Sequence, residues 1–170
     1  GIEMMSRVPM LSDAARVFND PAYAVQHQML LMGSGADLIA TRIGASREDC
    51  DAVALQSQQR AALAQQEGRF QSIVPIETPE GLISEDECIR ADMTAERLAR
   101  LPAAFAELGA AGADQLQLAK FSELVAIEHV HTMGNSPAMC DAGALVLLGD
   151  AALGESLGIS PKALSLIHIS

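Results

Sequence analysis

The sequence predicts an α/β fold in which helices pack against short strands. Apolar residues make up 49% of the 170-residue chain, yet only four Phe and one Tyr supply aromatic area. Ala, Leu, Ile, Val and Met must therefore build the interior, and small aliphatic side chains suit helix-on-sheet layers better than an all-β sandwich. One long helical pattern is clear in mid-chain, and short apolar runs bounded by Gly and Pro flank it.

The first quarter of the chain is predicted to alternate between loops and short helices. Residues 1–9 are expected to be the end of a buried strand that runs into a loop, and residues 20–29 a short helix. The glycines at 33–35 predict a turn that feeds a helix over 37–42. This turn could present backbone N–H groups to an anion, although two glycines alone favour a plain turn.

The clearest helix is predicted from residue 47 to residue 67. Ser46 is a suitable N-cap, and Glu48 and Asp49 place negative charge in the first turn. Gly68 stands just past the expected end of the helix.

Shorter elements are predicted downstream of this helix. Pro75 cannot donate to a ladder and therefore confines its strand to a sheet edge, and Thr94 is a suitable N-cap. The expected elements are an edge strand at 73–76, an extended piece at 86–90, a helix over 95–100, a loop with a helical turn at 109–120, an extended region at 124–132, and a helix start or buried strand at 142–148.

Charge and composition exclude several classes of protein. With a net charge of −11 and only 11 basic residues, the chain lacks the cationic surface of a nucleic-acid-binding protein. No stretch approaches the roughly 20 apolar residues that span a bilayer, so we expect a soluble protein. Three cysteines without a CxxC pair indicate neither a disulfide framework nor a zinc site, and predict reduced thiols in the cytoplasm.

Three groups of residues are candidates for chemistry. His129 and His131 would share one face of a strand and could bind a metal, although a half-exposed strand with polar alternation is favoured. Cys140 beside Asp141 could be a nucleophile next to an acid, but the sequence supplies no base and no oxyanion donors. A third group, the densest basic cluster, would suit an anion. It consists of Arg90, Arg97 and Arg100.

Six stretches of the chain match one family's motifs in order. They are G-I-E-M-M-S-R-V-P at 1–9, M-G-S-G-A-D-L-I-A at 32–40, S-R-E-D-C-D-A-V-A-L-Q-S-Q at 46–58, G-R-F and I-V-P within 68–75, D-E-C-I-R, T and L-P-A-A-F within 86–105, and G-N-S-P with Asp141 from 134. Together these stretches resemble the thiolase family.

The resemblance implies a thiolase-like fold built from two related α/β/α halves with mixed sheets. This chain would be an internal fragment containing part of the N-terminal half and the inserted loop domain. Residues 1–30 would end the N-terminal core, 31–132 would form the loop domain, and 133–162 would return to the core. The apolar tail at 163–170 is expected to be non-native sequence.

The resemblance also implies which residues meet the substrate. Thiolases use a nucleophilic cysteine, an acid/base cysteine and a histidine, which the family layout places outside this chain. Cys50, Cys88 and Cys140 match none of these motifs, so the fragment is expected to be inactive alone, with CoA and acyl-CoA as substrates and no further cofactor or metal. Residues implied to line the CoA channel are Met32, Arg90, Arg97, Met133, Ser136 and Pro137.

Departures from the family pattern leave the acyl-chain preference open. Leu31 stands where many biosynthetic thiolases have histidine, Pro137 stands where they have serine, and residues 141–143 invert the usual D-G-A order. The stretch between Phe105 and Gly134 is also longer than in short-chain biosynthetic members, which favours a degradative or unusual acetyltransferase.

Two other functions fit the sequence. The chain could belong to a thiolase-like subunit that binds CoA or lipid without catalysis, or to an unrelated α/β interaction domain. A full-length thiolase is expected to form homodimers or homotetramers and to bind neither nucleic acid nor membrane. The fragment alone is expected to aggregate, because missing strands would leave sheet edges and apolar faces uncovered.

Overall fold

The computed structural model describes residues 1–9, 12, 15, 23, 26–27, 29–160 and 162–163. Most of the helix predicted over 20–29 and of the tail at 163–170 lies outside these residues. The elements along the described chain are β1 (Ile2–Glu3), α3 (Met32–Ile43), α4 (Arg47–Gln66), β2 (Ile76–Thr78), β3 (Gly81–Ile83), α5 (Ala95–Ala99), α6 (Ala106–Leu108), η1 (Gly109–Ala113), α7 (Asp114–Lys120), β4 (Ala142–Gly143) and α8 (Ala151–Leu157).

The long helix α4 confirms the prediction for residues 47–67. The Ser46 hydroxyl accepts a hydrogen bond from the Asp49 amide at 3.1 Å, and the Asp49 carboxylate accepts one from the Ser46 amide at 2.9 Å. This capping box satisfies two N–H groups that have no partner inside the helix. Gly68 follows the helix end with a φ of 67°, a conformation that favours glycine.

Helix α3 begins at Met32, so the glycine turn predicted at 33–35 is wrong. Gly33 and Gly35 lie in the first helical turn instead. The reason is tertiary: a Cβ on Gly33 would overlap the ring of Phe105, so glycine lets that ring pack against the helix backbone. The helix ends at Gly44, whose φ of 68° and N–H bonds to preceding carbonyls close it.

The strands of the described chain form two small antiparallel pairs. β1 pairs with β4 through Ile2↔Gly143 and Glu3↔Ala142, and β2 pairs with β3 in a hairpin. β1 is exposed rather than buried as predicted. The edge strand predicted at 73–76 is displaced along the chain: β2 begins at Ile76, directly after Pro75, because proline has no N–H to donate to the ladder.

Four predictions for the second half of the chain need correction. Residues 86–90 contain a turn at 87–88 rather than an extended piece. Residues 109–120, predicted as a loop with a helical turn, are helical throughout as η1 and α7, and continue α6. The φ of 125° at Gly112 kinks this helical run. Residues 124–131 form no strand, although Thr132 makes an isolated bridge with Ala103. The apolar run from Leu145 to Leu148 is neither helical nor buried.

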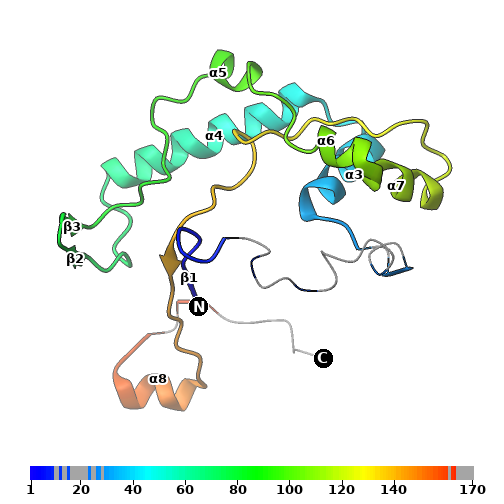
Figure 1. Ribbon diagram of the computed structural model, residues 1–170. Coiled ribbons are helices and arrows are strands. Elements are labelled where there is room, and N and C mark those ends of the chain that lie inside the picture. The colour runs from blue at the N-terminus through cyan, green and yellow to red at the C-terminus, as the bar shows by residue number, and fades with distance from the viewer. Residues whose placement is uncertain are drawn as a thin grey trace.

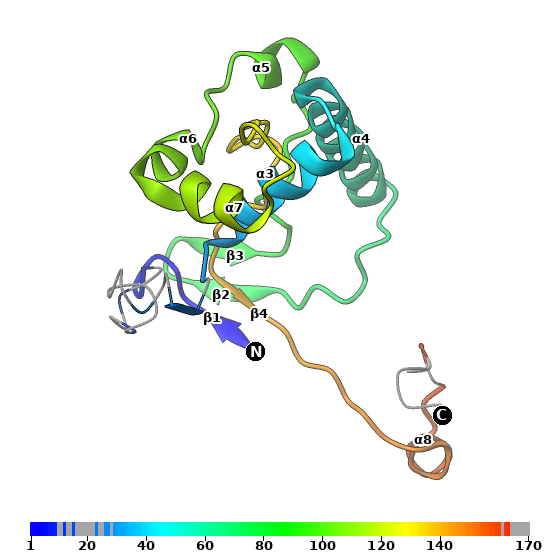
Figure 2. The same ribbon diagram turned by 90° about the vertical axis from the view of Figure 1, so that its right-hand side faces the viewer.

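The buried residues of the described chain all lie between Ser34 and Thr132. They are Ser34, Asp37, Ala40, Asp51, Leu98, Gly109, Ala113, Gln117, Ile127, Val130 and Thr132. Helices α3 to α7 gather around this part of the chain, whereas α8 lies apart at the end of an extended segment (Figures 1 and 2). No helix within the described ranges has the length and apolar character needed to cross a membrane.

Candidate functional site

A buried carboxylate on α3 organises the polar centre of the molecule. Asp37 is 0% exposed, and its Oδ1 accepts hydrogen bonds from the amides of Val130 and His131 at 3.2 and 3.1 Å and from His131 Nδ1 at 2.7 Å. Its Oδ2 lies 2.9 Å from His129 Nδ1. A buried charge is costly unless polar partners surround it. These contacts therefore allow the Asp37 carboxylate to be buried.

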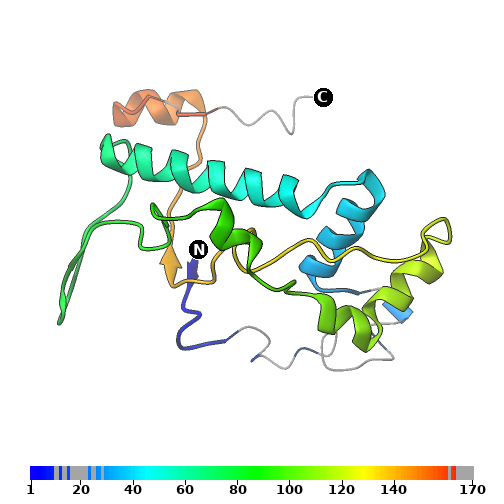
Figure 3. The same cartoon turned by 90° about the horizontal axis from the view of Figure 1, so that it is seen from above.

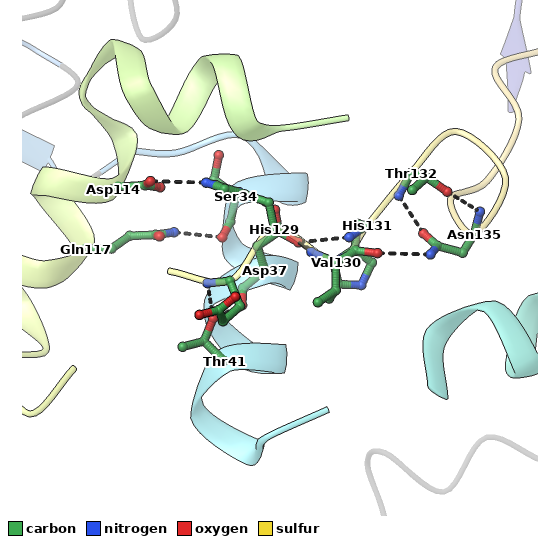
Figure 4. A network of polar contacts seen from close by, with 11 residues as sticks. Ser34, Asp37, Thr41, Asp114, Gln117, His129, Val130, His131, Thr132 and Asn135 are labelled. Atoms are coloured by element: carbon green, nitrogen blue, oxygen red, sulfur yellow. Dashed lines mark hydrogen bonds and ion pairs between the residues drawn. The ribbon is translucent and has the colours of Figure 1, made fainter. Parts of the chain in front are cut away.

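His129 lies between two carboxylates. Its Nδ1 faces Asp37, and its Nε2 lies 3.1 Å from Asp114 Oδ2 on α7. Burial lowers the pKa of His129, but the hydrogen bonds to Asp37 and Asp114 outweigh it and raise the pKa above its ordinary value. When protonated, the ring can donate from both nitrogens, and its two contacts link α3, the segment before Thr132 and α7 (Figure 4).

Further hydrogen bonds attach this segment and α7 to α3. The Thr41 hydroxyl donates to the Asp37 carbonyl at 2.8 Å and accepts from the Glu128 amide at 2.9 Å. From α7, the Gln117 side chain donates to the Ser34 carbonyl at 2.7 Å. The Thr41 and Asp37 contacts hold residues 128–131 along α3, and the labelled His129, Val130 and His131 lie beside Asp37 (Figure 4).

Asn135 continues the network toward α4. Its Oδ1 accepts from the Thr132 amide at 2.7 Å, and its Nδ2 donates to the Val130 carbonyl at 3.1 Å and to Asp51 Oδ1 at 2.8 Å. The Asp51 carboxylate also accepts from Arg47 Nε at 2.8 Å. Asn135 therefore shapes the loop that follows Thr132 and ties it to α4.

Arg47 carries the same network to the end of α5. Its Nη2 donates to the carbonyls of Leu98 and Leu101 at 2.6 and 3.0 Å. Both leucines lie against Gly134, where an added Cβ would come within 2.5 Å of each side chain. The loop after Thr132 is thus positioned by polar contacts on one side and by close apolar packing on the other.

The two histidines do not form the metal site considered from the sequence. Both rings bond to Asp37, and the described residues contain no group of three His, Cys, Asp or Glu side chains arranged to hold a metal ion. The favoured alternative, a half-exposed strand with polar alternation, is also wrong, because the rings are turned inward onto a carboxylate. One signal could have indicated this: Ser34, Asp37 and Ala40 repeat every three residues, which places short side chains along one buried face of α3.

The predicted CoA-lining residues fall on three parts of the structure. Met32 opens α3 and is 87% exposed, while Met133, Ser136 and Pro137 share the loop after Thr132. Met133 and Pro137 are exposed, and Ser136 is half-buried. Asp37 of α3 bonds to Val130 and His131, and Asn135 bonds to the Val130 carbonyl. These contacts hold the loop near α3, so the part with Met32 and the part with this loop are connected.

The third part contains the two arginines. Arg90 is exposed and donates from Nη1 to the Glu87 carbonyl at 2.7 Å, while Arg97 on α5 donates to the Asp92 carbonyl at 3.0 Å and pairs with the Asp92 carboxylate. Within the described chain, no hydrogen bond or ion pair joins either arginine to Met32 or to the loop after Thr132. A pocket of about 420 Å³ lies beside Arg90. It is lined by Ala62, Gln65, Gln66, Glu85, Ile89 and Ala91.

None of the cysteines has the surroundings of a catalytic nucleophile. Burial, together with the neighbouring Asp49 and Asp51 carboxylates, raises the pKa of Cys50. A hydrogen bond with Cys140 raises the pKa of Cys88. Asp141 is no partner for Cys140, because its carboxylate accepts from the Ser6 hydroxyl at 2.6 Å and from the Ser6 amide at 2.8 Å.

Comparison with known proteins identifies the family. Residues 1–117 match the model of the thiolase N-terminal domain. The chain is 32% identical over 175 aligned residues to a 3-ketoacyl-CoA thiolase of Bacillus subtilis, covering 95% of this chain and 40% of that protein. It is 34% identical over 149 residues to an acetyl-CoA acetyltransferase of Chromobacterium violaceum, covering 84% of this chain and 32% of that protein. A crystal structure of human mitochondrial 3-ketoacyl-CoA thiolase in complex with CoA is 41% identical over 47% of this chain and 20% of its own, with a TM-score of 0.45.

The chain belongs to the thiolase family. The family match covers well over half of its residues, so the resemblance predicted from the motifs is confirmed and the unrelated interaction domain is excluded. The chain spans about 40% of the length of the Bacillus subtilis thiolase that it matches.

Proposed function

We propose that this chain is part of an acyltransferase that cleaves 3-ketoacyl-CoA with CoA or condenses acyl-CoAs, and that it supplies CoA contacts rather than catalytic groups. The observation that carries the proposal is the match of residues 1–117 to the thiolase N-terminal domain. The names of the similar proteins, a 3-ketoacyl-CoA thiolase and an acetyl-CoA acetyltransferase, support the substrate class.

The proposed CoA contacts divide the ligand among three parts of the chain. Arg90 and Arg97 would attract the phosphates and stack on the adenine, which matters because a chain of net charge −11 must gather its cations locally. Met32 would touch the pantetheine or acyl end. The loop that carries Met133, Ser136 and Pro137 would shape the pantetheine channel, and its anchoring by Asp37 and Asn135 supports a pre-formed wall.

We assign the catalytic groups to other parts of the full-length enzyme. A nucleophilic cysteine needs a lowered pKa, whereas the pKa values of Cys50 and Cys88 are raised. Residues 31–132 would be the inserted loop domain, with 1–30 and 133–162 belonging to the N-terminal core. The full-length protein would form a homodimer or homotetramer and would need no cofactor beyond its CoA substrates.

Calorimetric titration of the 170-residue chain with CoA tests the proposed contacts. A charged hydrogen bond from arginine contributes about 1.5–3 kcal/mol, so Arg90→Ala should weaken binding by roughly tenfold or more. Arg69→Ala removes an exposed arginine outside the proposed site and serves as the matched control, with unchanged affinity expected. Equal weakening by both substitutions, or no binding of CoA at all, would overturn the proposed contacts.

An assay of acetyl-CoA condensation by the full-length protein separates the enzyme from the non-catalytic alternative. The proposed enzyme turns over, while the 170-residue chain alone shows no activity. A full-length protein that binds CoA without turnover would instead support a binding subunit.

A further inference from the structure

One turn at the start of α4 bonds to two other segments of the chain. Arg47 Nη2 donates to the carbonyls of Leu98 and Leu101 at 2.6 and 3.0 Å, at the C-terminal end of α5. Asp51 lies one turn further along α4, and its Oδ1 accepts from Asn135 Nδ2 at 2.8 Å. Helix α5 and the yellow chain that leads into the loop after Thr132 both lie beside α4 in two perpendicular views (Figures 1 and 3).

The two α4 side chains also bond to each other, and together they form what we call the α4 clamp. Arg47 Nε donates to Asp51 Oδ2 at 2.8 Å, and the two side chains are only 22% and 10% exposed. A guanidinium donates from several nitrogens in fixed directions, so one arginine can hold the carboxylate and the two carbonyls of α5 at the same time. The clamp is therefore a single bonded unit with one contact surface for each segment.

The position of Arg47 within α4 shows that its contacts lie outside the helix. It is the first residue of α4, where the positive end of the helix dipole disfavours a cation. The capping box of Ser46 and Asp49 already satisfies this end of the helix. The bonds to α5 and to Asp51 therefore account for an arginine at this position better than helix stability does.

The clamp spans two parts of the proposed CoA site. Arg97 directly precedes Leu98 on α5, and Ser136 directly follows Asn135 in the loop. The leucine side chains at the end of α5 pack against Gly134, which brings α5 and the loop together through apolar contacts. Apolar contacts are not directional, so the hydrogen bonds of the clamp determine how the two parts are oriented toward each other.

We propose that Arg47 and Asp51 are positioning residues for CoA, which hold α5 and the loop after Thr132 at the separation that one CoA molecule spans. This inference rests on the proposed function, in which Arg97 meets the phosphate-bearing end of CoA and Ser136 the pantetheine end. A ligand that must contact two sites at once binds tightly only when their separation matches its length. The clamp touches neither end of CoA and acts through the two segments that it holds.

Calorimetric titration of the full-length protein with CoA and with its two halves, adenosine bisphosphate and pantetheine, tests the clamp. Arg47→Gln should weaken CoA binding by about tenfold, because the two segments no longer meet the ligand together. Each half needs only one segment, so its affinity should change by less than about twofold. A residue that merely stabilised the fold would affect CoA and its halves alike.

Two further variants complete the test. Arg47→Lys keeps the charge but cannot hold the carboxylate and both carbonyls, so it should lose CoA affinity in the same selective way, and it replaces Arg47→Gln if that variant does not fold. Arg60→Gln removes an exposed arginine of the same helix and should leave all three affinities unchanged.

The results separate the clamp from the proposed function. Equal changes for CoA and both halves, or full CoA affinity in Arg47→Lys, would overturn the clamp and leave the proposed function intact. Failure of the wild type to bind CoA would overturn the proposed function and the clamp with it.

Discussion

Two regions of the molecule are held in different ways: the chain between Ser34 and Thr132, and the segments on either side of it. The first contains every buried residue of the described chain, including Asp37, Leu98 and Thr132, each 0% exposed. Residues 136–160 contain none, and Leu145 is 99% exposed at the centre of an apolar run. A two-residue ladder between β1 and β4 is the regular structure that joins the flanks.

The difference shows that buried polar groups fix the central region. Its aliphatic core is small, so the hydrogen bonds of Asp37, Asn135 and Arg47 determine how α3, α4 and the loop after Thr132 meet. Both oxygens of Asp37 are satisfied, whereas Ser34 Oγ, Asp114 Oδ1 and Gln117 Oε1 are buried without a hydrogen-bond partner in the described chain. The satisfied members around Asp37 are therefore the ones that specify this arrangement. In the described part of the flanks, the Asp141 carboxylate accepts two hydrogen bonds from Ser6, and the apolar side chains of residues 145–148 are exposed.

The largest expected effect is the loss of the buried carboxylate. Asp37→Ala leaves two backbone amides and two imidazole rings without their partner, and breaking a buried charged network costs about 3–5 kcal/mol. Urea unfolding should show a drop of this size. Asp92→Ala, which removes an exposed carboxylate, should leave the free energy of unfolding close to that of the wild type. Equal effects would mean that the central network does not hold this region.

Replacement of Gly134 tests the packed side of the same loop. A Cβ at this position would lie 2.5 Å from the side chains of Leu98 and Leu101, and overpacking of this kind costs about 1–3 kcal/mol. Gly35→Ala is the matched control, because it faces open space within α3 and should stabilise the helix by about 0.5–1 kcal/mol. A neutral Gly134→Ala would show that the loop is not tightly packed.

The pH dependence of stability tests the imidazole between two carboxylates. The pKa of His129 in the folded chain is raised above its ordinary value of 6.5. Its contribution to stability is therefore fully present below about 6.5, the pKa expected in the unfolded chain, and is lost as the pH rises through the higher folded pKa. The stability difference between the wild type and His129→Gln should be largest at acid pH and shrink toward alkaline pH. A difference independent of pH would contradict the protonated bridge.

The smallest effect on stability is expected in the exposed apolar run. Leu145→Ser with Leu147→Ser removes side chains that are 99% and 67% exposed, so the free energy of unfolding should hardly change. Self-association measured by light scattering should decrease, because an uncovered apolar surface promotes it. By contrast, Leu98→Ala in the buried region should cost about 2–5 kcal/mol. A large loss of stability in the double serine variant would show that the run is covered in solution.

Local signals in the sequence predicted the elements that depend on nearby residues. Ser46 and Thr94 each cap the helix that follows them, because a capping hydroxyl bonds to an amide three residues away. Gly68 likewise marks a helix end as expected, whereas the strand predicted at 73–76 begins only after Pro75, at Ile76. The family motifs predicted the thiolase membership from the same local patterns.

Contacts between distant residues could not be predicted in this way. Gly33 was expected to form a turn, and only its contact with Phe105 shows why a helix forms there. The partner of His129 and His131 is Asp37, 92 and 94 positions earlier in the chain, and no spacing rule links them. The six CoA-lining residues come from the family resemblance, and their role stays a prediction.

Amide hydrogen exchange tests most directly whether the Asp37 network holds the central region. The amides of Val130 and His131 donate to the Asp37 carboxylate, whereas within the described chain no hydrogen bond engages the amides of Leu145 to Leu148. We expect strong protection of the first pair, lost in Asp37→Ala, and exchange near the unfolded rate in the second group. Equal protection in the two groups, or unchanged protection of Val130 and His131 in Asp37→Ala, would contradict the account.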